Sequence, residues 1–244
     1  SWPHRKDSIC AFIHRVDPDI IDMQEVLHHQ LEVLKTGLPE YTVVGVGRED
    51  GKTAGEYAPI FFKQAKYTLL DQNTFWLCEK PDSVGMVGWD AALTRIATWV
   101  KLQDKKTGQI LMVVNTHFDH IGTEARRNSA LLIIEKIKEI VGTSPAILTG
   151  DFNVSEDWDA YKTITNNEFI LKDAHKVAGK RTGVDFTYHN FGKIPAEKCE
   201  KIDFIFVTPQ IRVISSYIPF SQLNDTLFLS DHNPEIVELE IEKS

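Results

Sequence analysis

The sequence predicts an α/β protein in which two mostly antiparallel sheets pack face to face and helices cover their outer faces. Roughly ten strand-like apolar runs stand against three or four helical patterns, which is too strand-rich for a doubly wound sheet. Several runs are apolar almost without interruption, as strands are when both of their faces are buried. No internal repeat, low-complexity segment or linker divides the chain, so we expect residues 1–244 to form a single domain.

The first elements alternate between helix and strand. Apolar residues at helical spacing predict a helix that begins near Asp7 or Ser8. Residues 19–23 predict a short buried strand, and residues 26–34 predict a second helix that Gly37 closes. Strands are expected next at residues 41–46, 58–62 and 67–70.

The second half of the chain continues this alternation. Residues 77–92 are rich in turn-forming residues and predict a loop. Residues 94–103 and 109–115 predict a hairpin that turns at residues 106–108. Residues 125–141 form the clearest amphipathic helical pattern. The remaining strands are expected at residues 145–148, 201–207, 211–218 and 236–241.

Composition excludes several classes of protein. The hydrophobic share of 42% and the charged share of 25% are ordinary for a soluble globular protein. No apolar stretch approaches the ~20 residues that cross a bilayer. The three cysteines, Cys10, Cys78 and Cys199, lack the spacing of a zinc site or a disulfide framework, and we expect buried thiols. The formal charge of -8 disfavours a surface that follows extended nucleic acid.

Five polar clusters each follow or interrupt an apolar, strand-like run. Strand ends from distant parts of the sequence can meet at one rim of a layered fold. Carboxylate, amide and imidazole groups gathered there could hold a hard divalent cation and move protons around a phosphate. The clusters are Gln24-Glu25, Asn115-Thr116-His117, Gly150-Asp151-Phe152-Asn153, Ile202-Asp203-Phe204 and Ser230-Asp231-His232.

The acidic and amide members of these clusters suggest specific chemistry. Asp151 and Asn153 are two residues apart, so in extended backbone their side chains would point to the same face and could hold a water. An ordinary Gly-Asp turn with an Asn cap is the alternative. Glu25 is either an oxygen ligand for Mg²⁺ or a solvated group that caps the following helix.

Two histidines are candidate catalytic groups. Asp203 lies between large apolar residues, where burial is costly without a partner, and pairing with His232 would remove that cost. Glu56 is the candidate that orients His117. The segment from His117 to Gly122 also partly matches the HxHxDH signature of metallo-β-lactamases, but its first histidine is missing, which disfavours a binuclear zinc site.

Arg95 is a cation within an otherwise apolar strand. Pointing inward, it could bind phosphate oxygens with two parallel hydrogen bonds; facing solvent is the alternative. Five aromatic residues predict packing, with one or two lining a substrate pocket: Trp76, Trp89, Trp158, Phe186 and Tyr188.

The order and spacing of the clusters resemble the endonuclease/exonuclease/phosphatase superfamily, which includes DNase I, repair nucleases, sphingomyelinases and inositol polyphosphate phosphatases. The resemblance extends from Trp2 to Pro234 and is greatest to compact bacterial members of unassigned substrate. It implies a four-layer α/β sandwich and a Mg²⁺- or Mn²⁺-dependent phosphoesterase. In that family a first strand carries an asparagine that shares the metal, and the present numbering begins after that point, so we expect that strand to be missing from residues 1–244.

The resemblance also implies a role for each site residue. Glu25 would bind the metal, with Asp231 on the same side. Asp151 and Asn153 would together handle both the water and the phosphate. His232, oriented by Asp203, would be a base or a phosphate contact. The other roles implied are leaving-group or transition-state stabilisation by His117, its alignment by Glu56, and charge neutralisation by Arg95.

The expected partner is a phosphorylated small molecule or a nucleotide, rather than extended nucleic acid. We expect a soluble monomer without stable membrane insertion, with cytoplasmic and exported locations both open. A non-catalytic domain that keeps the fold and binds a phosphate ligand is the alternative to an enzyme. The intact set of acids and imidazoles favours the enzyme, of either phosphodiesters or phosphomonoesters.

Overall fold

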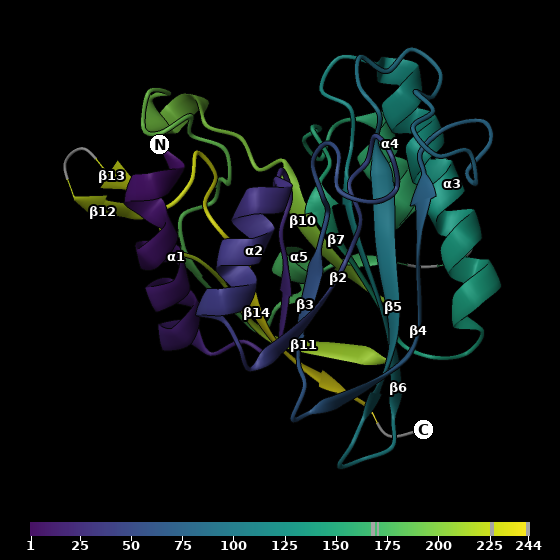
Figure 1. The fold of residues 1–244 in the computed structure, drawn as a ribbon, viewed down its shortest axis with the longest axis horizontal. Helices are drawn as coiled ribbons and strands as arrows, with labels where there is room; N and C mark the ends of the chain where they lie inside the picture. The colour runs from purple at the N-terminus through teal and green to yellow at the C-terminus, as the bar shows by residue number, and fades with distance from the viewer. Residues whose placement is uncertain (167–168, 170, 225–226, 243–244) are drawn as a thin grey trace.

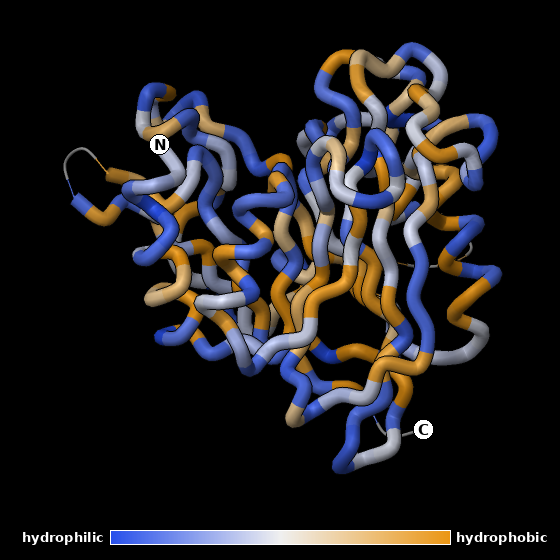
Figure 2. Tube along the Cα trace, viewed as in Figure 1, coloured by the Kyte–Doolittle hydropathy of each residue, from blue (hydrophilic) through white to orange (hydrophobic). Residues whose placement is uncertain are grey.

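Two central layers of strands lie between two outer layers of helices (Figure 1). The computed structural model describes residues 1–166, 169, 171–224 and 227–242. The predicted four-layer α/β sandwich is confirmed. Figure 2 shows hydrophobic residues concentrated along the central strands, as burial of both sheet faces requires.

The larger sheet has six strands and positions most of the site. Its order is β4 (Tyr67–Trp76), β5 (Ile96–Asp104), β6 (Ile110–His117), β7 (Ala146–Asp151), β10 (Asp203–Val207) and β8 (Lys172–Asp173). The β6–β7 pair is parallel, and the other neighbours are antiparallel. Parallel neighbours need a crossover, which α3 (Thr123–Val141) supplies on the outer face. α4 (Asp159–Thr165) completes that helical layer, and the core between it and the sheet contains Ile133, Ile137, Phe152 and Phe206.

The second strand layer consists of two three-stranded sheets. β1 (Ile20–Asp22), β3 (Ile60–Lys63) and β2 (Tyr41–Val44) form one, against which α1 (Trp2–Val16) and α2 (His28–Gly37) pack. β14 (Ile236–Ile241), β11 (Ile211–Ile218) and β9 (Lys180–Gly183) form the other. The described chain also contains α5 (Ala174–Val177), a 3₁₀ turn (Ala196–Lys198), β12 (Gln222–Asn224) and β13 (Leu227–Phe228).

A cavity of ≈ 1180 Å³ separates the two sheets of this second layer. β1 and β14 are edge strands of their sheets, and both line the cavity. Apolar residues of the six-stranded sheet line it as well, among them Leu111, Val113, Ile147 and Ile205. A further strand could fill an apolar slot between two strand edges. The expected first strand stays a prediction, and this cavity is where it would lie.

Several element boundaries differ from the sequence expectations. The first helix begins at Trp2 rather than near Asp7 or Ser8, because Pro3 in its first turn is compatible with a helix start. β4 continues to Trp76, well beyond the expected residues 67–70. Its exposed polar residues pair with β5 at the sheet edge and give no apolar signal.

Other element boundaries match the expectations closely. β11 and β14 have the predicted bounds, and the predicted hairpin of β5 and β6 is present. The three cysteines are free, but the expected burial holds only for Cys78, since Cys10 and Cys199 are partly exposed. Among the described helices, none combines the length and the apolar character needed to span a membrane.

Candidate active site

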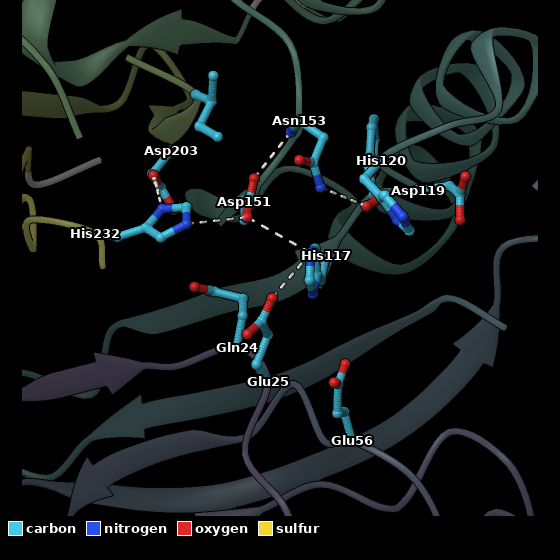
Figure 3. Close-up of polar contacts among 12 residues, drawn as sticks. Gln24, Glu25, Glu56, His117, Asp119, His120, Asp151, Asn153, Asp203 and His232 are labelled. Carbon is cyan, nitrogen blue, oxygen red and sulfur yellow. Dashed lines mark hydrogen bonds and ion pairs between the residues drawn. The ribbon is translucent and has the colours of Figure 1, made fainter. Parts of the chain in front are cut away.

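Strand register brings three of the polar clusters side by side. His117 at the end of β6 is the cross-strand partner of Asp151 at the end of β7. Asp151 is in turn the partner of Asp203 at the start of β10. Because the last pair is antiparallel, the end of β7 and the start of β10 lie at the same edge of the sheet. Figure 3 shows these side chains converging with Glu25 and His232.

Gly150 permits the close approach of β6 and β7 on which this register depends. A Cβ atom at residue 150 would lie 2.4 Å from the carbonyl oxygen of Thr116, closer than any side chain tolerates. The glycine before Asp151 is therefore required by the packing of the two parallel strands.

Asp151 is a buried carboxylate between two imidazoles. Its Oδ2 atom lies 3.5 Å from Nε2 of His117 and 3.9 Å from Nε2 of His232, and its side chain is 7% exposed. Burial, and then the negative charge of Asp203, raise the pKa of Asp151 to about 8. A carboxylate with a pKa in this range can accept a proton near neutral pH.

Asp203 and His232 form the predicted pair. Nδ1 of His232 lies 2.7 Å from Oδ2 of Asp203. Burial alone would lower the pKa of His232, but the carboxylates of Asp203, Asp151 and Asp231 outweigh it and raise the pKa to about 10. The ring of Tyr188, one of the predicted pocket aromatics, packs against this imidazole at 4.9 Å between centroids.

His117 has the opposite electrostatic environment. Its side chain is 10% exposed. Burial lowers the pKa of His117 well below its usual value, and the positive charges of Arg95 and Arg48 lower it further. His117 is therefore neutral, whereas His232 carries a proton.

Glu56 does not make the predicted contact with His117. Its Oε2 atom instead accepts a hydrogen bond from Nη1 of Arg48 at 2.5 Å. The described residues provide no hydrogen bond between Glu56 and His117. Both line a cavity of ≈ 10 Å³, together with Arg48 and Arg95, which is about the room that one water needs. Glu56 pairs with Arg48 and not with His117, because a charged guanidinium forms stronger hydrogen bonds with a carboxylate than a neutral imidazole does.

Arg95 is buried, so the solvent-facing alternative is excluded. It is 4% exposed, its Nε atom contacts Oδ2 of Asp119 at 3.4 Å, and its Nη2 atom lies 3.0 Å from Nδ1 of His120. Nη1 is buried and has no hydrogen-bond partner among the described residues. Asp119 and His120, the residues that suggested a zinc site, thus anchor Arg95.

Asn153 reaches the site by a different local structure from the one expected. Its backbone is left-handed, with φ of 50°, so residues 151–153 are a turn and not extended strand. Asp151 Oδ1 accepts the Asn153 backbone N–H at 2.9 Å, and Asn153 Nδ2 donates to the carbonyl of Phe118 at 2.9 Å. The turn, which was the alternative to extended strand, is therefore present, and it places Asn153 beside Asp151 (Figure 3).

Glu25 and Asp231 lie at the exposed side of the same cleft. Glu25 Oε1 is 4.0 Å from Nε2 of His117, and the side chain is 60% exposed. Partial burial raises the pKa of Glu25, and repulsion from Glu56 and Asp231 raises it further. Mutually repelling carboxylates are stabilised by a divalent cation, so these residues have the chemistry of a metal site.

A second set of donors lies deeper in the cleft. Asp151, Asp203 and His232 each offer an atom within 4.8 Å of the others, the arrangement of a possible acidic and histidine metal site. Glu25 and Asp231 are outside this group of three. Since His232 is already paired with Asp203, the carboxylates are the more suitable donors for a hard cation.

Sequence reasoning missed two contributors to the site. Arg48 lies between strands in a loop without periodicity, and no sequence signal marks it. Asn115 belonged to a recognised cluster, but its role became visible only across the two sheets. It is fully buried, accepts from Gln24 Nε2 at 2.6 Å and donates to the carbonyls of Met23 and Pro59, which holds the segment that leads to Glu25.

The other predicted aromatics have structural roles. Trp76 is buried and donates its indole N–H to the carbonyl of Arg48. Trp158 is 45% exposed and packs on Arg126, with 5.1 Å between guanidinium carbon and ring centroid. Phe186 contacts the ring of Phe220. Trp89 is half-buried in the loop that precedes β5.

The layered fold and its rim of acids and imidazoles define the DNase I-like class of α/β proteins. Residues 1–232 match the Endonuclease/Exonuclease/phosphatase family, and the chain belongs to that family, as its sequence pattern predicted. Members of this family include hydrolases that act on phosphate esters.

Three known proteins illustrate the range of similarity. A structure described as an endonuclease/exonuclease/phosphatase from Bacteroides vulgatus is 63% identical, with a TM-score of 0.97 over 99% of this chain and 92% of that one. A mannosyl-6-phosphatase from Bacteroides thetaiotaomicron is 36% identical, with a TM-score of 0.92 over 99% and 92% of the two chains. Nocturnin of Drosophila melanogaster is 22% identical over 90% of this chain, which spans only 38% of that longer protein.

Proposed function

We propose that this protein is a divalent-metal-dependent phosphoesterase that uses an activated water to hydrolyse a phosphomonoester or phosphodiester. Its substrate would be a small organic phosphate or a nucleotide-type molecule. The observation that carries this proposal is the buried Asp151 carboxylate between two imidazoles, one of them paired with a second carboxylate. The similarity to a mannosyl-6-phosphatase supports a sugar phosphate as the first substrate to test.

The metal proposed is Mg²⁺ or Mn²⁺, because the donors at the exposed side of the cleft are carboxylate oxygens. Glu25 and Asp231 would hold it. When bound, the cation would supply Lewis-acid polarisation of the phosphate and neutralise its charge. The raised pKa of Glu25, which the neighbouring acids cause in part, supports a cation at this position.

Asp151 would accept the proton of the attacking water. Its raised pKa of about 8 matches a general base that works near neutral pH. Asn153, held beside it by the turn, would orient the water or the phosphate through its side-chain oxygen, since its amide nitrogen donates to Phe118.

The cationic groups would bind the phosphate oxygens. His232, with a pKa of about 10, carries a proton and would donate to a phosphate oxygen. Arg95, which is buried beside His117, would neutralise charge on the phosphate. His117 is neutral, so it would stabilise the transition state as an N–H donor and not as an imidazolium.

Hydrolysis of a substrate panel tests this proposal. The panel contains p-nitrophenyl phosphate, bis-p-nitrophenyl phosphate, mannose 6-phosphate and a short oligonucleotide, each with Mg²⁺, Mn²⁺ or EDTA. We expect turnover of at least one ester with metal and none with EDTA. If no ester on the panel is hydrolysed under any metal condition, the proposal is wrong and the alternative of a non-catalytic phosphate-binding domain is favoured.

We also propose that the domain has one more strand, which fills the slot between β1 and β14. Asp22 supports this, because its Oδ1 atom is buried beside the cavity without a hydrogen-bond partner among the described residues. A backbone N–H from a strand in the slot would satisfy it. A chain carrying that strand is expected to unfold at a higher temperature than residues 1–244, and calorimetry of the two would decide.

A further inference from the structure

A buried ion pair lies directly beside the Asp203–His232 pair. Nζ of Lys201 is 2.7 Å from Oε2 of Glu235, and their side chains are 13% and 3% exposed. Lys201 precedes Asp203 by two residues, and Glu235 follows His232 by three. The same two chain segments are therefore joined twice, once by each pair.

Lys201 also contacts Asp203 itself. Its Nζ atom donates to the backbone carbonyl of Asp203 at 2.5 Å and lies 4.1 Å from the ring centroid of Phe204. The ammonium group is thus held by a carboxylate, a carbonyl and an aromatic face. These contacts fix the backbone from which the Asp203 side chain extends toward His232.

Glu235 is anchored from the other side. Ser216 on β11 lies with its Oγ atom 3.4 Å from Glu235 Oε1, and His175 Nδ1 lies 2.8 Å from the same hydroxyl. Through Ser216, the ion pair therefore contacts β11 as well as the segments that carry Asp203 and His232. Buried ion pairs contribute little net stability compared with apolar packing, so their value is often the conformation that they specify.

We propose that Lys201 and Glu235 are positioning residues, which hold Asp203 and His232 in the geometry needed for phosphate ester hydrolysis. The inference rests on the proposed function, because it assigns the Asp203–His232 pair to that reaction. Neither residue is assigned a contact with the substrate. Both act through the distance between Nδ1 of His232 and Oδ2 of Asp203, which is 2.7 Å.

Three variants test the proposal. Lys201→Met combined with Glu235→Gln removes both charges without leaving one buried and unpaired. Lys201→Arg keeps the positive charge but replaces the ammonium group with a planar guanidinium. It provides the test if the double variant does not fold. Arg212→Met combined with Glu240→Gln is the control, since this exposed ion pair joins β11 to β14 at the end of those strands away from Ser216 and Glu235.

Two readouts are measured on each variant. The first is kcat and KM on the best ester of the panel. The second is the downfield proton resonance of the hydrogen bond between His232 and Asp203, assigned by its loss in His232→Gln. We expect the double variant to lose about 10- to 100-fold in kcat with KM unchanged, as for a displaced catalytic group, and to lose or shift the resonance. Lys201→Arg should be intermediate in both, and the control should match wild type.

The inference would be overturned if the folded double variant had wild-type kcat and an unshifted resonance. If the double variant does not fold, the same result in Lys201→Arg would overturn it. So would a loss of kcat without any change in the resonance, because the pair would then act in some other way. If wild type hydrolyses no ester, the proposed function fails, but the resonance still decides whether Lys201 and Glu235 set the geometry of the pair.

Discussion

The two imidazoles of the cleft contact the same oxygen of Asp151 but differ in charge: His117 is neutral and His232 is protonated. His117 lies beside Arg95 and Arg48, and its pKa is well below the usual value. His232 lies among three carboxylates, and its pKa is raised to about 10. Both are histidines at the margin of apolar strands, so residue type does not separate them. Their neighbours decide which one carries a proton, and thereby which role each can take.

Removing the carboxylate that the two histidines share should have the largest effect. We expect Asp151→Ala to lower kcat by about 10²–10⁴-fold, because the proposed base is lost and both imidazoles lose their common partner. Steady-state kinetics with metal at saturation would measure this. Asp159→Ala, at the start of α4, is the control for removal of an exposed aspartate. Near-normal turnover in Asp151→Ala would remove Asp151 from the reaction.

The His232 side of the comparison is tested by His232→Ala. We expect a loss of about 10²–10³-fold in kcat, since a protonated donor to the phosphate disappears. The fold should persist, which circular dichroism would verify. A variant that keeps most of its rate would show that His232 has no direct part in turnover, and the comparison between the imidazoles would lose its functional meaning.

Substitution of a proposed metal ligand should change the metal concentration that activity requires, which is a smaller effect than the losses of kcat above. Glu25→Gln should raise the Mg²⁺ concentration for half-maximal activity by on the order of tenfold, because a charged oxygen ligand becomes neutral. Glu124→Gln, an exposed glutamate on α3, is the matched control. An unchanged metal titration in Glu25→Gln would exclude Glu25 as a ligand.

The charge of His232 also predicts a dependence of stability on pH. Its pKa rises from 6.5 in a model imidazole to about 10 in the folded protein, so its contribution is complete below pH 6.5 and is lost as pH rises through 10. The difference in unfolding free energy between wild type and His232→Gln should therefore shrink by about 4 kcal/mol over this range. Urea denaturation at several pH values would measure it, and a difference that does not vary with pH would contradict the raised pKa.

The layers and the rim could be predicted because long apolar runs dominate this sequence. Such runs predict buried strands, and their polar ends must meet water at an edge of the sheet. Asp203 is the clearest case, since an acid among large apolar residues required a partner and His232 is that partner.

Contacts made by loops could not be predicted in this way. Glu56 pairs with Arg48, a residue in a segment without periodicity, so no pattern distinguished it from His117 as the partner. The turn at Asn153 was also ambiguous, because spacing by two residues fits both a strand and a turn closed by an aspartate side chain. The edge strand β4 was underestimated because its polar middle has no apolar alternation.

The most direct test of the central claim is a metal titration of ester hydrolysis by the wild-type protein and by Asp151→Asn, with the best ester of the panel. The proposed mechanism predicts saturable activation of wild type by Mg²⁺ or Mn²⁺, complete reversal by EDTA, and almost no activity of Asp151→Asn at any metal concentration. Hydrolysis that persists in EDTA, or that is equal in the two proteins, would contradict it.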